Sequence, residues 1–223
     1  MPERRWGPRP ARGRRSVPDE RLRDISVSVR EGTPEWPGDT PYSCRWTWQM
    51  AKGASVNVSA ITMSPHVGTH ADAPLHVHDG WPSSERLPLS AFVGRAVVHT
   101  LSGSGDLPSG NIERLLLRTG RSIADGSFPE DWPALSVAAV NDLLRRGLVL
   151  LGVDAPSVDA RDSKALEVHH ALFSGGAFNL ENLDLRDAPD GEYDLVALPL
   201  RLSGVDAAPV RAMLLPVGRS SSG

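Results

Sequence analysis

The chain has 223 residues, 40% of them hydrophobic, and a formal net charge of −3, so it is long enough to bury one core. This balance excludes a protein that is basic throughout, and no apolar run approaches the ~18 residues of a membrane span. A single cysteine, Cys44, excludes a disulfide framework and a multi-cysteine zinc site. We therefore expect a cytoplasmic protein with a small-molecule partner, without nucleic acid or membrane, in which His, Asp and Glu hold any metal.

The first 21 residues differ in kind from the rest of the chain. Seven arginines and several prolines lie there, without the apolar region of a secretory signal. We expect residues 1–21 to be a disordered extension, since they have almost nothing to bury; a tether to nucleic acid or membrane is the alternative. Residues 217–223 are expected to be a loose tail, which leaves residues 22–216 as one domain.

Between these tails, short segments of different type follow one another. Alternating apolar residues predict a strand at 23–31, and dense proline and glycine predict a structured loop at 33–43. The same patterns predict further strands at 44–50, 55–63, 94–101, 113–120, 148–159 (running into a loop), 193–204 and 210–216. Helices are predicted at 135–147 and 163–176, where apolar spacing is helical and glycines follow. Many strands with two helices indicate an α/β or α+β single domain.

One segment, SPHVGTHADAPLHVHDG, holds four of the chain's seven histidines. His66 and His70 have the spacing of a helical metal site, but Gly68 and the flanking prolines argue against a helix. A glycine-containing turn can bring the same side chains together, with Thr69 donating a hydrogen bond to a nearby carboxylate. Two imidazoles and Asp72 suit zinc or manganese, with distant residues and water completing the site.

The alternative is a polar loop that is rich in histidine without binding anything. Lone histidines are most often surface residues or hydrogen-bonded core residues, and we interpret His78, His99 and His170 in this way. Three histidines and an aspartate within eleven residues, on a loop shaped by glycine and proline, favour the metal site instead.

The motif carries a resemblance to a known family. HVGTHADAPLH matches HxGTHxDxPxH, the signature of the metal-dependent cyclase-like hydrolases, which include the bacterial kynurenine formamidases. Other segments resemble the formamidases in the same order: WPGDTP, GVDAPSVD, SKALEVHH and DAAPVRAML. The resemblance covers about residues 22–216. It implies an α/β fold of the kynurenine formamidase-like swivelling β/β/α type, as a single domain.

The resemblance implies two zinc ions per subunit, with manganese as the alternative metal. It assigns the ligands to both halves of the chain: His66, His70, Asp72, His169 and Glu181. Asp72 and Glu181 would bridge the two ions, and His169 would bind only the second. His170 is the alternative to the adjacent His169, and Glu167 is the alternative to Glu181.

Two further residues receive roles from the resemblance. His76 is implied as the general acid/base that protonates the leaving nitrogen, which suits an imidazole because it exchanges protons near neutral pH; a metal ligand or an orienting residue is the alternative. Trp36 is implied to lie against the aromatic ring of the substrate, with a hydrophobic plug as the alternative. Asp154 and Ser157 are candidates for orienting the histidine ligands.

The implied reaction is hydrolysis of N-formyl-L-kynurenine to L-kynurenine and formate in tryptophan degradation, by attack of metal-activated hydroxide on the formyl carbon. One alternative is another hydrolase of the superfamily, such as an isatin hydrolase or a cyclic amide or ester hydrolase. Another is a non-catalytic metal-binding protein that kept the fold. The resemblance also implies a homodimer in which loops such as 33–43 reach the partner's site.

Overall fold

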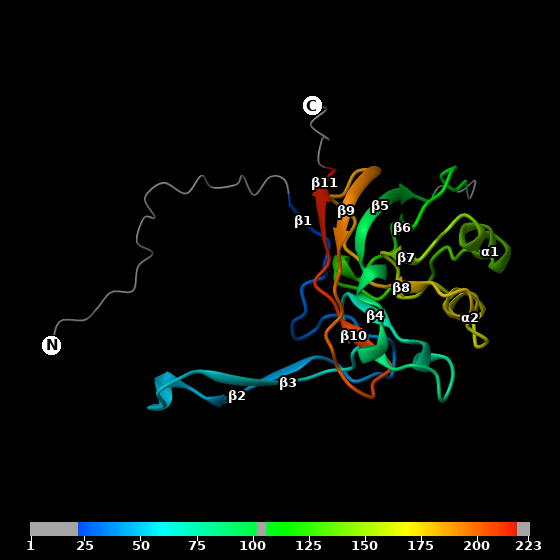
Figure 1. Cartoon of the computed structure of the whole chain (residues 1–223). Coiled ribbons are helices and arrows are strands. Elements are labelled where there is room, and N and C mark those ends of the chain that lie inside the picture. The colour runs from blue at the N-terminus through cyan, green and yellow to red at the C-terminus, as the bar shows by residue number, and fades with distance from the viewer. Residues whose placement is uncertain (1–21, 102–105, 218–223) are drawn as a thin grey trace, which may run out of the picture.

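The structure is a computed structural model that describes residues 22–101 and 106–217. The predictions about residues 1–21 and 218–223 fall outside these described residues. The central feature is a seven-stranded mixed sheet, coloured from blue to red in Figure 1. Its strands, in spatial order, are β1 (Arg23–Asp24), β11 (Met213–Pro216), β9 (Gly191–Val196), β5 (Val93–Thr100), β6 (Arg114–Arg118), β7 (Leu150–Val153) and β8 (Phe178–Leu180). β5 to β8 run parallel, and the other neighbours pair antiparallel.

Both faces of this sheet are buried, because alternate side chains of a strand point to opposite faces. On β6, Leu115 and Leu117 pack in one core with the two helices, α1 (Val137–Arg145) and α2 (Glu167–Ser174). Leu116 lies between them in sequence and packs in the second core, on the other face. Figure 1 shows α1 and α2 side by side on the same face of the sheet. Among the described residues, no helix has the length and apolar character needed to cross a membrane.

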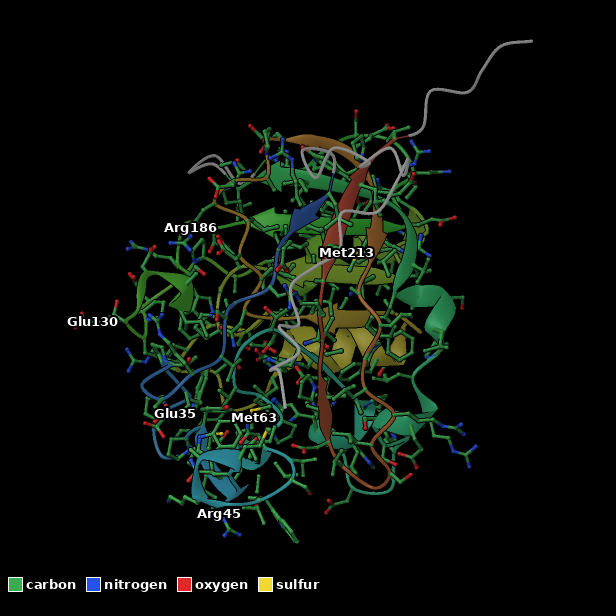
Figure 2. The ribbon with its side chains drawn as sticks, turned by 90° about the vertical axis from the view of Figure 1, so that its left-hand side faces the viewer. Glu35, Arg45, Met63, Glu130, Arg186 and Met213 are labelled. Atoms are coloured by element: carbon green, nitrogen blue, oxygen red, sulfur yellow. The ribbon has the colours of Figure 1, made fainter. Side chains whose placement is uncertain are left out.

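Two smaller sheets complete the described chain. β4 (His70–Asp72) pairs antiparallel with β10 (Ala207–Pro209), at the end of the main sheet. β2 (Ser43–Trp48) and β3 (Val58–Thr62) form a hairpin that projects far from the body, at the lower left of Figure 1. Figure 2 views the molecule from the side of this hairpin, on which Arg45 is labelled.

The predicted α/β class is confirmed, and both predicted helices are present, though each is shorter than predicted. The strand predicted at 23–31 is wrong beyond Asp24, because the chain leaves the sheet there and crosses towards the histidine segment. Ile25 is nevertheless buried, and Ser26 forms an isolated bridge with Leu183. The strand predicted at 193–204 ends at Val196.

Candidate metal centre

The histidine motif forms a tight turn followed by a short strand. Gly68 adopts a left-handed backbone (φ +74°), and a Cβ there would clash with Cγ2 of Val29. Glycine is therefore required both by the conformation and by the close packing. After the turn, His70 and Asp72 occupy alternate positions of β4, so their side chains point to the same face. The predicted non-helical turn is confirmed.

The Thr69 side chain ties the motif to two segments that are distant in sequence. Its hydroxyl accepts a hydrogen bond from the backbone N–H of Val27 (2.9 Å) and donates one to the backbone carbonyl of Asn182 (2.6 Å). The prediction that Thr69 donates to a carboxylate is therefore wrong. Its role is to hold three distant backbone segments together beside the site.

The C-terminal half reaches the motif through backbone pairing. The N–H of His70 donates to the carbonyl of Glu181 (3.3 Å), and the N–H of Glu181 donates back to the carbonyl of His70 (3.0 Å). Asn179 and Glu181 are two residues apart at the end of β8, so both side chains face the cluster. His169 lies in the first turn of α2 and is buried there. The structure thus brings all five predicted ligands together.

The two carboxylates of the cluster belong to Asp72 and Glu181, and the two oxygens of each lie beside different imidazoles. Oδ1 of Asp72 lies 3.0 Å from Nδ1 of His66 and 3.3 Å from Nε2 of His70. Its Oδ2 lies 3.1 Å from Nε2 of His169. Glu181 repeats the arrangement, with Oε1 3.2 Å from Nε2 of His169 and Oε2 3.5 Å from Nε2 of His70. Each carboxylate therefore presents its two oxygens to different imidazoles.

In each of these histidines, the ring nitrogen that points away from the cluster lies within hydrogen-bond distance of an oxygen acceptor. Nδ1 of His70 lies 2.9 Å from the carbonyl of Gly68, which leaves Nε2 facing the cluster. Nδ1 of His169 donates to Asp159 (2.7 Å), whose carboxylate also accepts from the first backbone N–H groups of α2. Nε2 of His66 donates to Oδ2 of Asp206 (2.9 Å). Such outer hydrogen bonds fix the tautomer and orientation of metal-binding histidines.

The contacts within the cluster fit a bound cation. Nδ1 of His66 and Nε2 of His70 lie 3.1 Å apart. Because the other nitrogen of each ring donates to an oxygen acceptor, two lone pairs face each other here when both rings are neutral. Oδ1 of Asp72 is fully buried beside them and makes no hydrogen bond of acceptable geometry. A divalent cation between these three atoms would satisfy all of them, and zinc or manganese accepts this donor set.

The same contacts perturb the ionisation of the cluster without metal. Burial lowers the pKa of His66, but the carboxylates of Asp206 and Asp72 outweigh it and raise the pKa to about 10. Burial likewise lowers the pKa of His70, which Asp72 and Glu181 raise to about 9. Burial raises the pKa of Asp72, but the surrounding imidazoles hold it well below its ordinary value. The metal-free site is thus a buried network of ion pairs.

His76 lies at the rim of the cluster. It ends the short 3-10 turn Pro74–His76, and its Nδ1 lies 3.3 Å from the same oxygen of Asp206 that holds His66. Its side chain is 29% exposed, whereas those of His70 and His169 are almost fully buried. Its ring nitrogen also comes within 4.8 Å of ligand atoms of His66 and Asp72, so the distances alone allow it to be a ligand.

A cavity of about 280 Å³ opens onto the cluster. Its other walls are largely apolar, with Pro34, Trp36, Phe128 and Leu166 among the lining residues. Trp36 makes edge-on contacts with Phe128 (5.5 Å between ring centroids) and Trp132 (5.9 Å). The loop 33–43 therefore lines the site of its own chain.

Within the described residues, the remaining candidates make no hydrogen bond, ion pair or ring contact with the clustered side chains. His170, next to His169, faces Trp81, and Glu167 is exposed on α2. Asp154 accepts hydrogen bonds from Thr119 and Gly120 instead of orienting a histidine, so that prediction is wrong. Ser157 accepts a hydrogen bond from the N–H of Asp159 and lines the cavity.

The carboxylates that hold the histidines, Asp159 and Asp206, were not predicted, although both lie in segments that resemble the family.

Comparison with known proteins agrees with this architecture. The Cyclase family model matches residues 23–160. A solved structure described as a potential metal-dependent hydrolase with cyclase activity superposes with a TM-score of 0.75 at 28% identity, covering 89% of this chain and 98% of that one. An isatin hydrolase shares the fold at 21% identity, with a TM-score of 0.72 over 87% of this chain and 92% of that one. The chain belongs to the Cyclase family.

Within that family, the sequence groups with bacterial kynurenine formamidases. A kynurenine formamidase of Bordetella petrii is 42% identical over 208 residues, which cover 89% of this chain and 100% of the relative. One from Bacillus cereus is 41% identical over 202 residues, covering 87% of this chain and 97% of the relative.

Proposed function

We propose that this chain hydrolyses N-formyl-L-kynurenine to L-kynurenine and formate, a step in tryptophan catabolism. The observation that carries the proposal is the similarity to kynurenine formamidases over nearly the whole length of those relatives, together with the presence of every residue of the motif. The largely apolar cavity beside the cluster, with Trp36 in its wall, suits a planar aryl group.

The five clustered side chains are proposed to bind two zinc ions per subunit: His66, His70, Asp72, His169 and Glu181. Two divalent ions held there would lower the pKa of a bound water towards neutrality and polarise the carbonyl oxygen of an amide. Asp72 and Glu181 offset the positive charge, and their separate oxygens suit two neighbouring ions. Manganese is the alternative metal.

His76 is proposed to move the proton that the reaction requires. Hydrolysis breaks the bond between the formyl carbon and the anilide nitrogen, and the leaving nitrogen must gain a proton. The hydrogen bond from Nδ1 to Asp206 leaves Nε2 of His76 free to take a proton from the attacking water and deliver it to that nitrogen. Its partial exposure at the cavity rim suits this role better than that of a buried ligand.

The substrate assignment is tested by offering N-formyl-L-kynurenine and isatin to the purified protein. We expect release of formate from the first and no more than slow ring opening of the second. Rapid opening of isatin without formamidase activity would replace the proposal with an isatin hydrolase. Fewer than one metal ion per chain, and no activity after zinc is added, would favour a non-catalytic protein.

We further propose that residues 22–216 form the catalytic domain and that it acts in the cytoplasm as a homodimer. The projecting β2–β3 hairpin supports a dimer, because it extends away from the body of the molecule in Figure 1 and carries exposed apolar side chains. More than half of the surface of each of these side chains is exposed: Trp46, Trp48, Met50 and Ile61. Exposed apolar patches of this kind commonly mark protein interfaces. Light scattering of the wild type and of Trp46→Asp tests this, since the variant should become monomeric.

A further inference from the structure

The cavity wall contains one carboxylate outside the histidine–carboxylate cluster. Asp39 lines the cavity together with Trp36, and the described lining contains neither arginine nor lysine. Within residues 22–101 and 106–217, no cationic side chain forms an ion pair with Asp39. A carboxylate without a cationic partner, at the wall of an aromatic cavity, favours a ligand that brings its own positive charge.

The loop holds Asp39 and Trp36 in a fixed relation. The N–H of Asp39 donates to the carbonyl of Trp36 (2.9 Å), closing a turn in which Gly38 has a φ of +93°. Oδ1 of Asp39 accepts from the N–H of Thr40 (2.7 Å), which leaves Oδ2 available. The carbonyl of Thr40 accepts from the N–H of Ser64, so this turn is tied to the segment that enters the histidine motif.

We infer that Asp39 determines specificity by binding the α-ammonium group of the substrate. This inference rests on the proposed function: with the aryl ring against Trp36 and the formamide at the cluster, the amino-acid side chain lies along the same wall. Because the described lining has no arginine or lysine, the substrate carboxylate points to solvent while the ammonium group points to Asp39. Neutral ring compounds such as isatin gain nothing from this contact.

The test compares two substrates that differ only in the ammonium group. One is N-formyl-L-kynurenine, and the other is its desamino analogue, 4-(2-formamidophenyl)-4-oxobutanoate, which keeps the ring, the formamide and the carboxylate. We expect Asp39→Asn to raise KM for the first substrate about tenfold, because one partly solvated charge-assisted hydrogen bond is lost. KM for the analogue should stay within about twofold, and kcat should change little for both.

A matched control lies in the same loop. Glu35 carries the same charge four positions before Asp39, does not line the cavity, and lies at the outer edge of the molecule in Figure 2. Glu35→Gln should leave both KM values unchanged, which separates a specific contact from a general effect of charge. Zinc content and melting temperature show whether each variant is folded. If Asp39→Asn does not fold, Asp39→Glu and Asp39→Gln provide the same comparison, the first with the charge kept and the second with it removed.

The outcomes separate the two proposals. An equal rise of KM for both substrates, or no rise for either, would overturn the role of Asp39 while leaving the formamidase activity in place. If the wild type hydrolyses neither substrate, the proposed function itself fails, and the inference fails with it. Selective loss of affinity for the ammonium-bearing substrate supports both.

Discussion

Asp72 and His76 lie four residues apart in one motif, but their surroundings predict opposite consequences of replacement. Asp72 is fully buried and faces all three clustered imidazoles, so Asp72→Ala should empty both metal positions. His76 is partly exposed at the rim, so His76→Ala should keep the metal and lower kcat about 10²- to 10⁴-fold. Elemental analysis of the purified variants, beside their kcat values, checks both expectations.

A metal-free His76→Ala protein would contradict this division of roles. The distances permit that outcome, because His76 lies within reach of the ligand atoms of His66 and Asp72. His78→Ala is the matched control from the same segment, since His78 is exposed and stacks on Trp81, away from the cluster.

Asp206 accepts hydrogen bonds from both His66 and His76, and we expect it to position them. Asp206→Asn should lower kcat about ten- to a hundredfold, as loss of such orienting groups generally does. If Asp206 acts through His76, the same substitution should add little to the loss of kcat in the His76→Ala background. Steady-state kinetics of the two single variants and the double variant measures this coupling.

Asp194 offers a control for that experiment. Its side chain has nearly the same exposure as that of Asp206, 44% against 43%, but it pairs with Arg95 on the sheet surface. Asp194→Asn should leave kcat unchanged. Additive losses in the Asp206 and His76 variants would mean that Asp206 acts only on the metal, through His66.

The sequence predicted the side chains that cluster in the structure but not the carboxylates that hold the outer nitrogens of the histidines. The motif brings His66, His70 and Asp72 together locally, so its spacing and glycine were enough to predict a common site. Asp206 is more than a hundred residues away, and it approaches only because β10 pairs with β4. Asp154 and Asp159 lie in the same segment, and the structure shows that Asp159 is the one that contacts α2 and His169.

The turn before β4 depends on Gly68. Gly68→Ala would force a Cβ into Val29 and strain a left-handed backbone, so we expect a loss of about 2–4 kcal/mol in the free energy of unfolding. Zinc content should fall as well, because the same turn aligns His66 with His70. Chemical denaturation and elemental analysis measure the two effects.

Gly120 provides a closely matched comparison. Its φ of +73° is almost the same as that of Gly68, but a Cβ there would meet no atom within 4 Å. Gly120→Ala should therefore cost only the backbone strain, about 1 kcal/mol. Equal losses in the two variants would mean that the contact with Val29 contributes nothing.

Among the elements, the long strands and helices were predictable and the shortest strands were not. β4, β8 and β10 have three residues each, too few for an alternating pattern to be recognised. These three strands surround the cluster, so the strands that build the site were those with the weakest alternation of apolar and polar residues in the sequence. Their existence depends on long-range pairing, such as that between His70 and Glu181.

For the molecule as a whole, the charged cluster predicts how the stability of the metal-free protein depends on pH. The pKa of His66 is about 10 when folded, against an ordinary value of 6.5. A raised pKa stabilises the fold fully below about pH 6.5, and this contribution is lost as the pH rises towards 10. The metal-free protein should thus lose on the order of 1 kcal/mol per pH unit between pH 7 and 9.

Melting temperatures of chelator-treated and zinc-loaded protein at pH 7 and pH 9 check this expectation. Bound zinc keeps the imidazoles deprotonated at both pH values, so the loaded protein should change much less. A parallel decline in the two forms would mean that the ion pairs of the cluster do not control the stability of the metal-free state.

The two hydrogen bonds of the Thr69 hydroxyl, which join three distant segments, have a consequence for how the protein folds during synthesis. The N–H of Val27, the hydroxyl of Thr69 and the carbonyl of Asn182 meet at one point, and the first and last strands, β1 and β11, are neighbours in the sheet. A nascent chain emerging from the ribosome carries the histidine motif long before Glu181, Asp206 and β11 exist. Because these contacts are so distant in sequence, we expect the centre to close only after nearly the whole chain has been released, which would make metal capture a late step of maturation.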